Sequence, residues 1–310
     1  SKFIHYRPKI LILNNLEFDH GDIFRDLLDI SRSFSHLLRI VPSDGYVLIN
    51  GDDPNLKELS DEPWTSTINV GLSEGNGLQI TEFSEDSKGS RFGLVWKGNK
   101  VMQIDWQMHG LFNARNLAMA TLASVLMQNI ESGERMNNPD FNPFAFATLP
   151  DFSSCTGVKR RQEILHESEK LIILSDFAHH PTAITGAIES LRARWPDREI
   201  IACFEPRSNT AVTNIFESRF VEALALADVA LLGAIYRAEK IPPENRIDPQ
   251  NMIIRINELG KKGHAFESNQ NLERFLMSSE FSNPSLVVFF SNGSFDGVID
   301  RFTDSFERRK

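Results

Sequence analysis

The chain has 310 residues, of which 41% are hydrophobic and 24% charged, a composition typical of globular proteins and a length that favours two domains. Its net charge of −9 argues against a nucleic-acid-binding surface, which needs clustered Lys and Arg, but not against one bound nucleotide. Two cysteines exclude a disulfide framework and a Cys-based metal cluster, and no apolar run reaches the roughly 20 residues of a membrane span, so we expect a cytoplasmic protein without a membrane partner.

The first elements form an α/β pattern. Residues 9–13 are apolar and predict a buried strand, and the segment before them has no signal-peptide core. Because the chain runs at once into this strand, we expect it to open in mid-domain, with an upstream segment in the natural protein. From Asp22 onward apolar residues recur at helical spacing and predict a helix; they are Ile23, Leu27, Ile30, Phe34, Leu37 and Leu38. Residues 47–53 predict a strand that ends in a turn.

The middle of the chain predicts strands, a helix and then a boundary. Residues 64–108 favour strands and hairpins, and residues 113–128 an alanine-rich helix. Regular structure is expected to stop near residue 150, because Asn-Pro occurs twice and Leu-Pro once in residues 137–150. We therefore predict one domain at 1–153 and a second at 154–310.

The second half alternates strands and helices. Residues 171–174, 199–204, 229–232 and 286–290 predict buried strands. Amphipathic segments between them predict helices, one begun by Pro181 and reaching Trp195, another running from Phe216 to Leu224. This alternation predicts an α/β fold with a mostly parallel sheet.

Polar clusters follow three of these strands, at residues 176–180, 205–210 and 291–296. Ligands of open α/β sheets bind at the carboxyl ends of the strands, so the clusters predict a binding site. Within the first cluster, Asp176 can accept from ribose hydroxyls and His179 can donate to a phosphate at the start of the following helix. A His-His metal site is the alternative, although the usual third and fourth ligands are not nearby in sequence.

Two segments of the first half also carry candidate ligands. Glu17-Phe18-Asp19-His20 offers oxygen ligands for Mg²⁺, and the alternative is that Asp19 or Asp22 caps the next helix. His36 lies on the polar face of that helix, where a histidine is more often solvated than a ligand.

Paired amides and a basic triplet are weaker signals. Asn113 and Asn116 lie three residues apart on one helix face and suit an adenine edge, unless Asn113 is simply an N-cap. Arg160 and Arg161, in Lys159-Arg160-Arg161, could contact phosphates or form a solvated face. The 310 residues contain no Gly-x-x-x-x-Gly-Lys-Ser/Thr phosphate loop, so the sequence alone predicts a nucleotide cleft without a phosphate cradle.

Taken in order, these segments resemble the Mur ligases over nearly the whole chain. The matching segments are residues 13–20, Asn113-Ala114-Arg115-Asn116, Arg160-Arg161, and residues 176–182, 204–210 and 291–297. The last two are most similar to the members that take a murein tripeptide. The resemblance implies the remainder of a central ATPase domain followed by a Rossmann-like C-terminal domain.

The activity that the resemblance implies is ATP- and Mg²⁺-dependent amide-bond formation in peptidoglycan recycling. The lactyl carboxylate of UDP-N-acetylmuramate would become an acyl phosphate, which the amine of the L-Ala-γ-D-Glu-meso-diaminopimelate tripeptide attacks. By the same resemblance, Glu17 would bind Mg²⁺ with His36 as its partner ligand. The nucleotide would be bound by Asn113, Asn116, Arg161, Asp176 and His179. The tripeptide pocket would be lined by Arg207, Asn292 and Asp296, with His179 and Arg207 as the catalytic residues.

Three departures from the family pattern qualify the resemblance. Phe112 stands in place of the histidine of the adenine motif, and Ser294 in place of a second glycine. The family's phosphate loop and UDP-sugar domain lie upstream of these residues, so we expect the isolated chain to have little or no ligase activity. The open alternatives are a UDP-N-acetylmuramate–alanine ligase and a non-catalytic nucleotide-binding module, whereas the two-histidine motif argues against the related folylpolyglutamate synthase.

Overall fold

The structure, a computed structural model, describes residues 2–59, 64–133, 141–152, 154–281 and 283–307. These residues form two compact units, Ser1–Thr156 and Gly157–Lys310. The division falls three residues after the predicted boundary at 153/154 (156 − 153). No helix of the described chain is long and apolar enough to cross a membrane.

The first unit contains a six-stranded sheet whose strands follow one another in chain order. The first four strands are parallel, and the last three, joined as hairpins, pair antiparallel. The strands are β1 (Ile10–Leu13), β2 (Tyr46–Asn50), β3 (Ser66–Gly71), β4 (Leu78–Asp86), β5 (Gly89–Trp96) and β6 (Asn99–Trp106). The strands predicted at residues 9–13 and 47–53, and the hairpins at 64–108, are confirmed.

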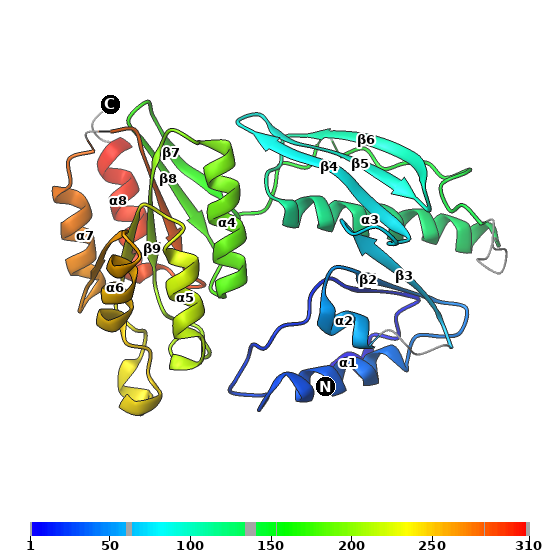
Figure 1. Cartoon of the computed structure of the whole chain (residues 1–310), viewed down its shortest axis with the longest axis horizontal. Helices are drawn as coiled ribbons and strands as arrows, with labels where there is room; N and C mark the ends of the chain where they lie inside the picture. Colours follow the sequence, from blue (N-terminus) through cyan, green and yellow to red (C-terminus); the bar gives the residue numbers. More distant parts are fainter. Residues whose placement is uncertain (1, 60–63, 134–140, 153, 282, 308–310) are drawn as a thin grey trace. The chain divides into compact units, whose positions relative to one another are not determined.

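Helices of the first unit cover both faces of its sheet. They are the short helix η1 (Lys2–His5), α1 (Leu27–Leu38), α2 (Pro54–Leu59) and α3 (Leu111–Ser132). Alternate residues of the strands point to opposite faces: Val47 and Ile49 of β2 pack with α1 and α2, whereas Tyr46 and Leu48 pack with α3. Figure 1 shows α3 running along the hairpin strands β4 to β6.

The start of α1 differs from its prediction. The helix begins at Leu27, because the Asp26 side chain accepts from the backbone N–H of Asp29 (2.9 Å) and so caps the first turn. Ile23 lies before the helix and is 69% exposed, so the helix predicted from Asp22 was placed too early. Neither Asp19 nor Asp22 is the N-cap.

The start of α3 excludes the alternative that Asn113 is simply a helix N-cap. Gly110, with a φ of 92°, occupies the N-cap position and donates its N–H to the Glu85 carboxylate (2.7 Å). Asn113 lies inside the first turn, where its side-chain amide donates to the carbonyl of His109 (2.6 Å). Asn113 is therefore not the cap of this helix.

The second unit is an open α/β sheet with strand order β11-β10-β9-β12-β8-β7. Every neighbouring pair is parallel except β7 with β8. The strands are β7 (Glu163–Glu167), β8 (Leu171–Asp176), β9 (Glu199–Phe204), β10 (Val229–Leu232), β11 (Lys262–Ala265) and β12 (Ser285–Phe290). The four predicted strands are confirmed, and β7 and β11 were not predicted.

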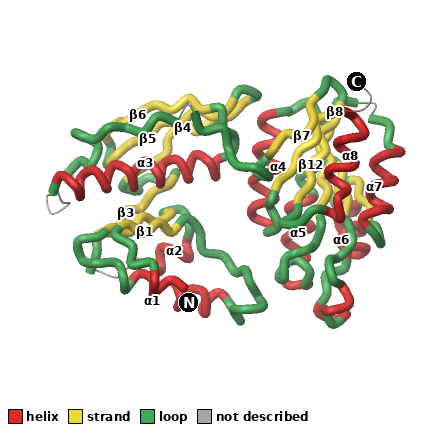
Figure 2. The backbone as a smooth tube through the Cα atoms, turned by 180° about the vertical axis from the view of Figure 1, so that it is seen from behind, coloured by secondary structure: helices red, strands yellow, loops and turns green. Residues whose placement is uncertain are grey.

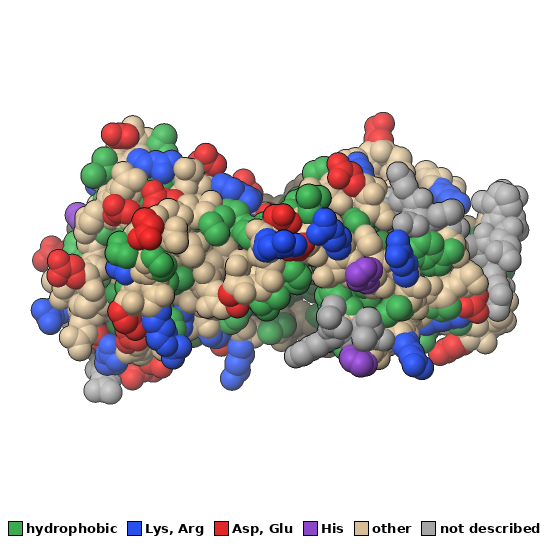
Figure 3. All heavy atoms as spheres, turned by 90° about the horizontal axis from the view of Figure 1, so that it is seen from below, with side chains coloured by type: hydrophobic (Ala, Val, Ile, Leu, Met, Phe, Trp, Pro, Cys, Tyr) green, Lys and Arg blue, Asp and Glu red, His purple; other side chains and the backbone are tan. Residues whose placement is uncertain are grey.

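Helices cover both faces of this sheet as well (Figures 1 and 2). They are α4 (Pro181–Arg194), α5 (Glu217–Leu224), α6 (Pro249–Glu258), α7 (Asn269–Ser278) and α8 (Val298–Glu307), with short helices η2 (Asn214–Phe216), η3 (Ala238–Lys240), η4 (Pro243–Asn245) and η5 (Phe295–Gly297). Cys203 of β9 faces α7 and α8, while its neighbour Phe204 stacks with Phe220 of α5 (ring centroids 4.7 Å apart). On the face shown in Figure 3, acidic and basic side chains are interspersed.

Candidate active site

The polar loop after β1 meets the first turns of α3 in the first unit. The amide of Asn14, directly after β1, donates to the side-chain oxygen of Asn116 (2.6 Å). The Asn14 side-chain oxygen is itself buried and accepts no hydrogen bond from the described residues. An unsatisfied buried acceptor is costly, so this position suits a ligand that carries a polar N–H.

A carboxylate beside this pair joins β2, β3 and α3. Asp52 accepts from the backbone N–H groups of Leu72 (2.7 Å) and Ser73 (3.0 Å) and lies 3.4 Å from the Arg115 guanidinium. Burial acts to raise the pKa of Asp52, but these donors and Arg115 outweigh it and hold the pKa at about 2. Asp52 therefore stays ionised and fixes Arg115, one residue before Asn116.

The predicted metal ligands lie on two elements of this unit. Glu17 is half-buried in the loop after β1, and His36 is exposed near the end of α1. In the described part of the chain no group of three or more His, Cys, Asp and Glu side chains could hold a metal. Glu17 supplies the oxygen chemistry that Mg²⁺ prefers, whereas the imidazole of His36 suits it less well.

In the second unit, Asp176 ends β8 and is 4% exposed. Its two oxygens accept from the backbone N–H groups of Ala178 (2.7 Å) and Gln162 (3.0 Å). Burial raises the pKa of Asp176, opposed by these hydrogen bonds and by the nearby Arg161 and Arg160. The carboxylate thus stabilises the loop before α4, and any ribose contact would have to use its remaining lone pairs.

His179 and the N-terminus of α4 follow Asp176. Pro181 occupies the first turn of α4, as predicted. The Nδ1 atom of His179 lies 2.9 Å from the carbonyl oxygen of Phe177, which can only accept, so Nδ1 carries the proton. Nε2 of neutral His179 is then an acceptor, and donation to a phosphate from Nε2 would require the imidazolium form.

The adjacent arginines have different surroundings. Arg160 donates to the backbone carbonyls of Ser291 (2.6 Å) and Gly293 (2.5 Å), and so ties the loop after β12 to the start of this unit. Arg161 is exposed. Both guanidinium groups lie near the Phe177 ring, at 5.1 and 5.2 Å from its centroid.

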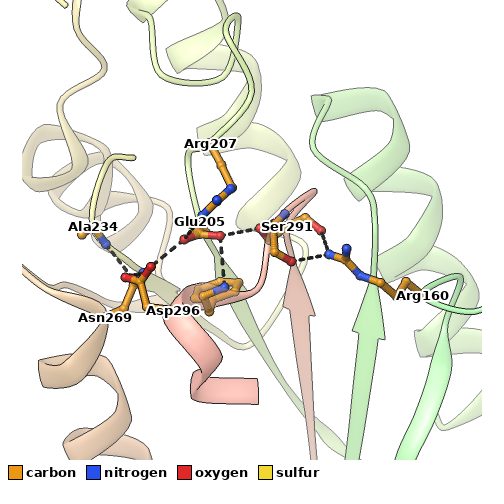
Figure 4. Close-up of polar contacts among 9 residues, drawn as sticks. Arg160, Glu205, Arg207, Ala234, Asn269, Ser291 and Asp296 are labelled. Carbon is orange, nitrogen blue, oxygen red and sulfur yellow. Dashed lines mark hydrogen bonds and ion pairs between the residues drawn. The ribbon is translucent and has the colours of Figure 1, made fainter. Parts of the chain in front are cut away.

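The polar ends of β9 and β12 meet around Glu205, as Figure 4 shows. One oxygen of Glu205 accepts from the Ser291 hydroxyl (2.5 Å), and the other from Asn269 (3.1 Å). Arg207 lies 3.4 Å from the carboxylate and covers the Tyr236 ring at 3.8 Å. The predicted tripeptide ligand Arg207 is therefore held between Glu205, directly after β9, and Tyr236, in the loop after β10.

The other two predicted pocket residues belong to the loop after β12. Asp296 is exposed, and one of its oxygens accepts from the Asn269 amide (2.8 Å). The side-chain oxygen of Asn292 is buried and has no hydrogen-bond partner among the described residues. The structure thus joins Asp296 to Arg207 through Asn269 and Glu205.

Three site residues were not singled out from the sequence, namely Glu205, Tyr236 and Asn269, and Arg160 was named only as a possible phosphate contact. Glu205 lay inside a predicted polar cluster, so a charged residue directly after a buried strand was a usable signal. Asn269 and Tyr236 lie at the site because of the order of the strands in the sheet, and the sequence pattern does not reveal that order.

Comparison with known proteins places these features in a known context. Residues 1–124 match the family model of the Mur ligase middle domain, and residues 160–293 that of the Mur ligase, glutamate ligase domain. UDP-N-acetylmuramate–L-alanyl-γ-D-glutamyl-meso-2,6-diaminoheptandioate ligases from Escherichia coli (strain K12) and Haemophilus influenzae are 35% and 29% identical over 100% and 98% of the chain. A UDP-N-acetylmuramate–L-alanine ligase from Desulfitobacterium hafniense is 27% identical over 94% of the chain, and the chain spans 61–62% of the length of these three relatives.

Solved structures agree in fold. A murein peptide ligase from Psychrobacter arcticus has a TM-score of 0.61 at 26% identity, with 98% of this chain and 59% of that chain covered. A UDP-N-acetylmuramate–alanine ligase from Thermotoga maritima has a TM-score of 0.71 at 18% identity, with 100% and 62% covered. The latter likeness is one of fold alone.

Proposed function

Because the chain belongs to the Mur ligase family, we propose that it is part of an ATP-dependent ligase that joins L-Ala-γ-D-Glu-meso-diaminopimelate to UDP-N-acetylmuramate. The observation that carries this choice of acceptor is the 35% identity, along the whole chain, to a relative named for this reaction. The reaction belongs to peptidoglycan recycling and would take place in the cytoplasm.

The residues of the first unit fit the nucleotide side of this reaction. ATP with Mg²⁺ would supply the phosphoryl group that activates the lactyl carboxylate of UDP-N-acetylmuramate. Glu17 would hold the metal, with His36 as the proposed second ligand. The Asn14–Asn116 pair would bind the adenine edge, and its buried unsatisfied oxygen supports this assignment. The side-chain N–H of Asn113 already donates to the His109 carbonyl, so Asn113 would contact the adenine through its side-chain oxygen.

The second unit would provide the phosphate and acceptor contacts. Arg161, exposed beside Phe177, would reach the phosphates, with Asp176 and His179 on the ribose and phosphate side. Arg207, with Asn292 and Asp296, would orient the tripeptide so that its amine attacks the acyl phosphate and phosphate leaves. Most of the rate enhancement of such a step comes from positioning and charge neutralisation.

Replacement of the proposed metal ligand tests this assignment in the complete gene product, because the 310 residues contain no phosphate loop. Glu17→Gln should lower kcat/KM by about 100-fold, since an amide binds Mg²⁺ less well than a carboxylate. Excess Mg²⁺ should restore part of the activity. Glu74→Gln, at an exposed turn, is the matched control. Equal activity of the Glu17→Gln variant and the control would remove Glu17 from the metal site.

A further inference from the structure

Glu205 is a buried carboxylate, and the burial of a charge away from water is energetically unfavourable. It directly follows Phe204, the last residue of β9, and is 1% exposed. A buried carboxylate persists only when donors satisfy its oxygens. The structure supplies four, from Ser291, Asn269, Arg207 and the backbone N–H of Phe295.

The two oxygens of Glu205 serve different groups. Oε2 accepts from the Ser291 hydroxyl (2.5 Å) and the Phe295 N–H (3.3 Å), both in the loop after β12. Oε1 accepts from Asn269 (3.1 Å) and Arg207 (3.4 Å). Oε2 therefore stabilises the loop, and Oε1 faces Arg207, which is assigned to the acceptor, and Asn269.

Arg207 is confined on further sides. Its guanidinium covers the Tyr236 ring, and its side chain runs over Gly293, where an added Cβ would lie 2.2 Å from the Arg207 Nε. Tyr236 and Gly293 limit where the guanidinium can go, and Glu205 provides the charge that selects one orientation. The side-chain amide of Asn269, which donates to Glu205, also donates to Asp296 (2.8 Å), so Glu205 restrains Asp296 indirectly.

We propose that Glu205 is a positioning residue for acceptor binding, which holds Arg207 directly and Asp296 through Asn269 in the orientation that receives the incoming peptide. Four donors within the chain occupy the Glu205 oxygens, so the residue acts through Arg207 and Asn269. This inference rests on the proposed function, because the acceptor assigned to Arg207 comes from it.

Glu205→Gln is the informative change. With its oxygen kept toward Ser291 and Phe295, the amide nitrogen faces Arg207 and Asn269, which are donors too, so their hydrogen bonds are lost while the loop is kept. In the complete gene product we expect the KM for the tripeptide to rise about tenfold, the order expected for one hydrogen bond to a charged group. The KM for ATP should stay within about twofold.

A double-mutant cycle separates positioning from a general structural role. Because Glu205 acts on Arg207 and, through Asn269, on Asp296, Glu205→Gln should raise the tripeptide KM of an Arg207→Ala variant by clearly less than the roughly tenfold expected in the wild-type protein. Asp228→Asn is the matched control, since Asp228 also pairs with an arginine (Arg192, 2.6 Å) but at the amino end of β10. Additive effects of the two substitutions, or equal rises in the KM for ATP and tripeptide, would overturn the inference.

A second readout does not depend on turnover. The ¹⁵N side-chain resonances of Arg207, assigned with Arg207→Lys, should report restricted rotation in the wild-type protein and faster rotation in Glu205→Gln. Unchanged Arg207 resonances would refute the positioning role even if ligation is observed. If the wild-type protein fails to ligate while the resonances change as expected, the proposed function is wrong and the fixing of Arg207 by Glu205 stands.

Discussion

Asp52 shows how one side chain can set the geometry beside the proposed adenine site. It lies in the turn after β2, yet its oxygens accept from Leu72 and Ser73, directly after β3. Gly71 permits this approach, because a Cβ there would lie 2.5 Å from an Asp52 oxygen. Asp52 thereby joins the ends of two parallel strands to Arg115 on α3.

The pH dependence of stability tests this arrangement. The pKa of Asp52 in the folded chain is about 2, below its ordinary value of 3.8. Its stabilisation is therefore present above pH 3.8 and is lost as the pH falls toward 2. Asp52→Asn should lower the free energy of unfolding by about 1–3 kcal/mol at pH 7, and by progressively less below pH 4, as measured by urea denaturation.

The control for this series is Asp105→Asn. Asp105 also pairs with an arginine, Arg91, but both side chains are largely exposed (75% and 65%). Such surface pairs contribute about 0–1 kcal/mol. A loss in Asp52→Asn as small as that of the control, or one that does not depend on pH, would show that Asp52 is not the anchor described above.

The site residues mark the limit of what local sequence reveals. Polar residues directly after buried strands identified the edge of the sheet at which Asp176, Glu205 and Ser291 meet. The pattern did not distinguish Arg160 from Arg161, since both lie in one basic triplet. Arg160 turns toward the loop after β12 because that loop presents two carbonyls to it, and the order of the strands determines this contact.

Capping explains where α1 begins. The apolar spacing extends back to Ile23, but spacing alone does not show which residue can satisfy the first free N–H groups. Asp26 does so by accepting from Asp29. Asp26→Ala should therefore lower the free energy of unfolding by about 1 kcal/mol, measured by urea denaturation.

Asp26→Asn is the matched variant for this prediction, because asparagine caps helices about as well as aspartate. Its loss should be only a few tenths of a kcal/mol. Equal losses for alanine and asparagine would indicate that the charge near Arg25, rather than the cap, stabilises this region.

The sequence pattern predicted the strands in the centre of the second sheet but not its two edge strands. β8, β9, β10 and β12 are continuous apolar runs, as expected for strands covered by helices on both faces. β11 has the sequence Lys-Gly-His-Ala and lies at one edge, while β7 is antiparallel at the other edge with a register shift near Ile164. Edge position relaxes the need for apolar residues, so their pattern carries little signal.

At the scale of the whole chain, the two cysteines differ in their exposure and should therefore differ in how fast they react with a thiol reagent. Cys155 is exposed beside the division of the two units, whereas Cys203 is fully buried in β9, where burial raises the pKa of its thiol. One thiol should react promptly with a thiol reagent in the folded protein, and the second only when the second unit unfolds. Cys155→Ser should abolish the fast phase, and a residual fast phase would contradict the burial of Cys203.

For the complete gene product, we propose that the acceptor is the tripeptide and not free L-alanine. The relatives include ligases named for L-alanyl-γ-D-glutamyl-meso-2,6-diaminoheptandioate and ligases named for L-alanine, and those described above align over 94–100% of this chain. The Glu205–Arg207 network would place a fixed guanidinium in the proposed acceptor pocket. A longer acceptor that carries several carboxylates can use such a group better than free alanine can.

Phosphate release by the complete gene product with Mg-ATP and UDP-N-acetylmuramate, measured with tripeptide and with free L-alanine, tests this claim most directly. We predict turnover with the tripeptide and a kcat/KM for L-alanine lower by at least about 100-fold, because polar groups of the proposed acceptor pocket would lose their partners. Turnover with L-alanine that equals or exceeds that with the tripeptide would contradict the assignment. Absence of turnover with both would indicate a nucleotide-binding module in place of a ligase.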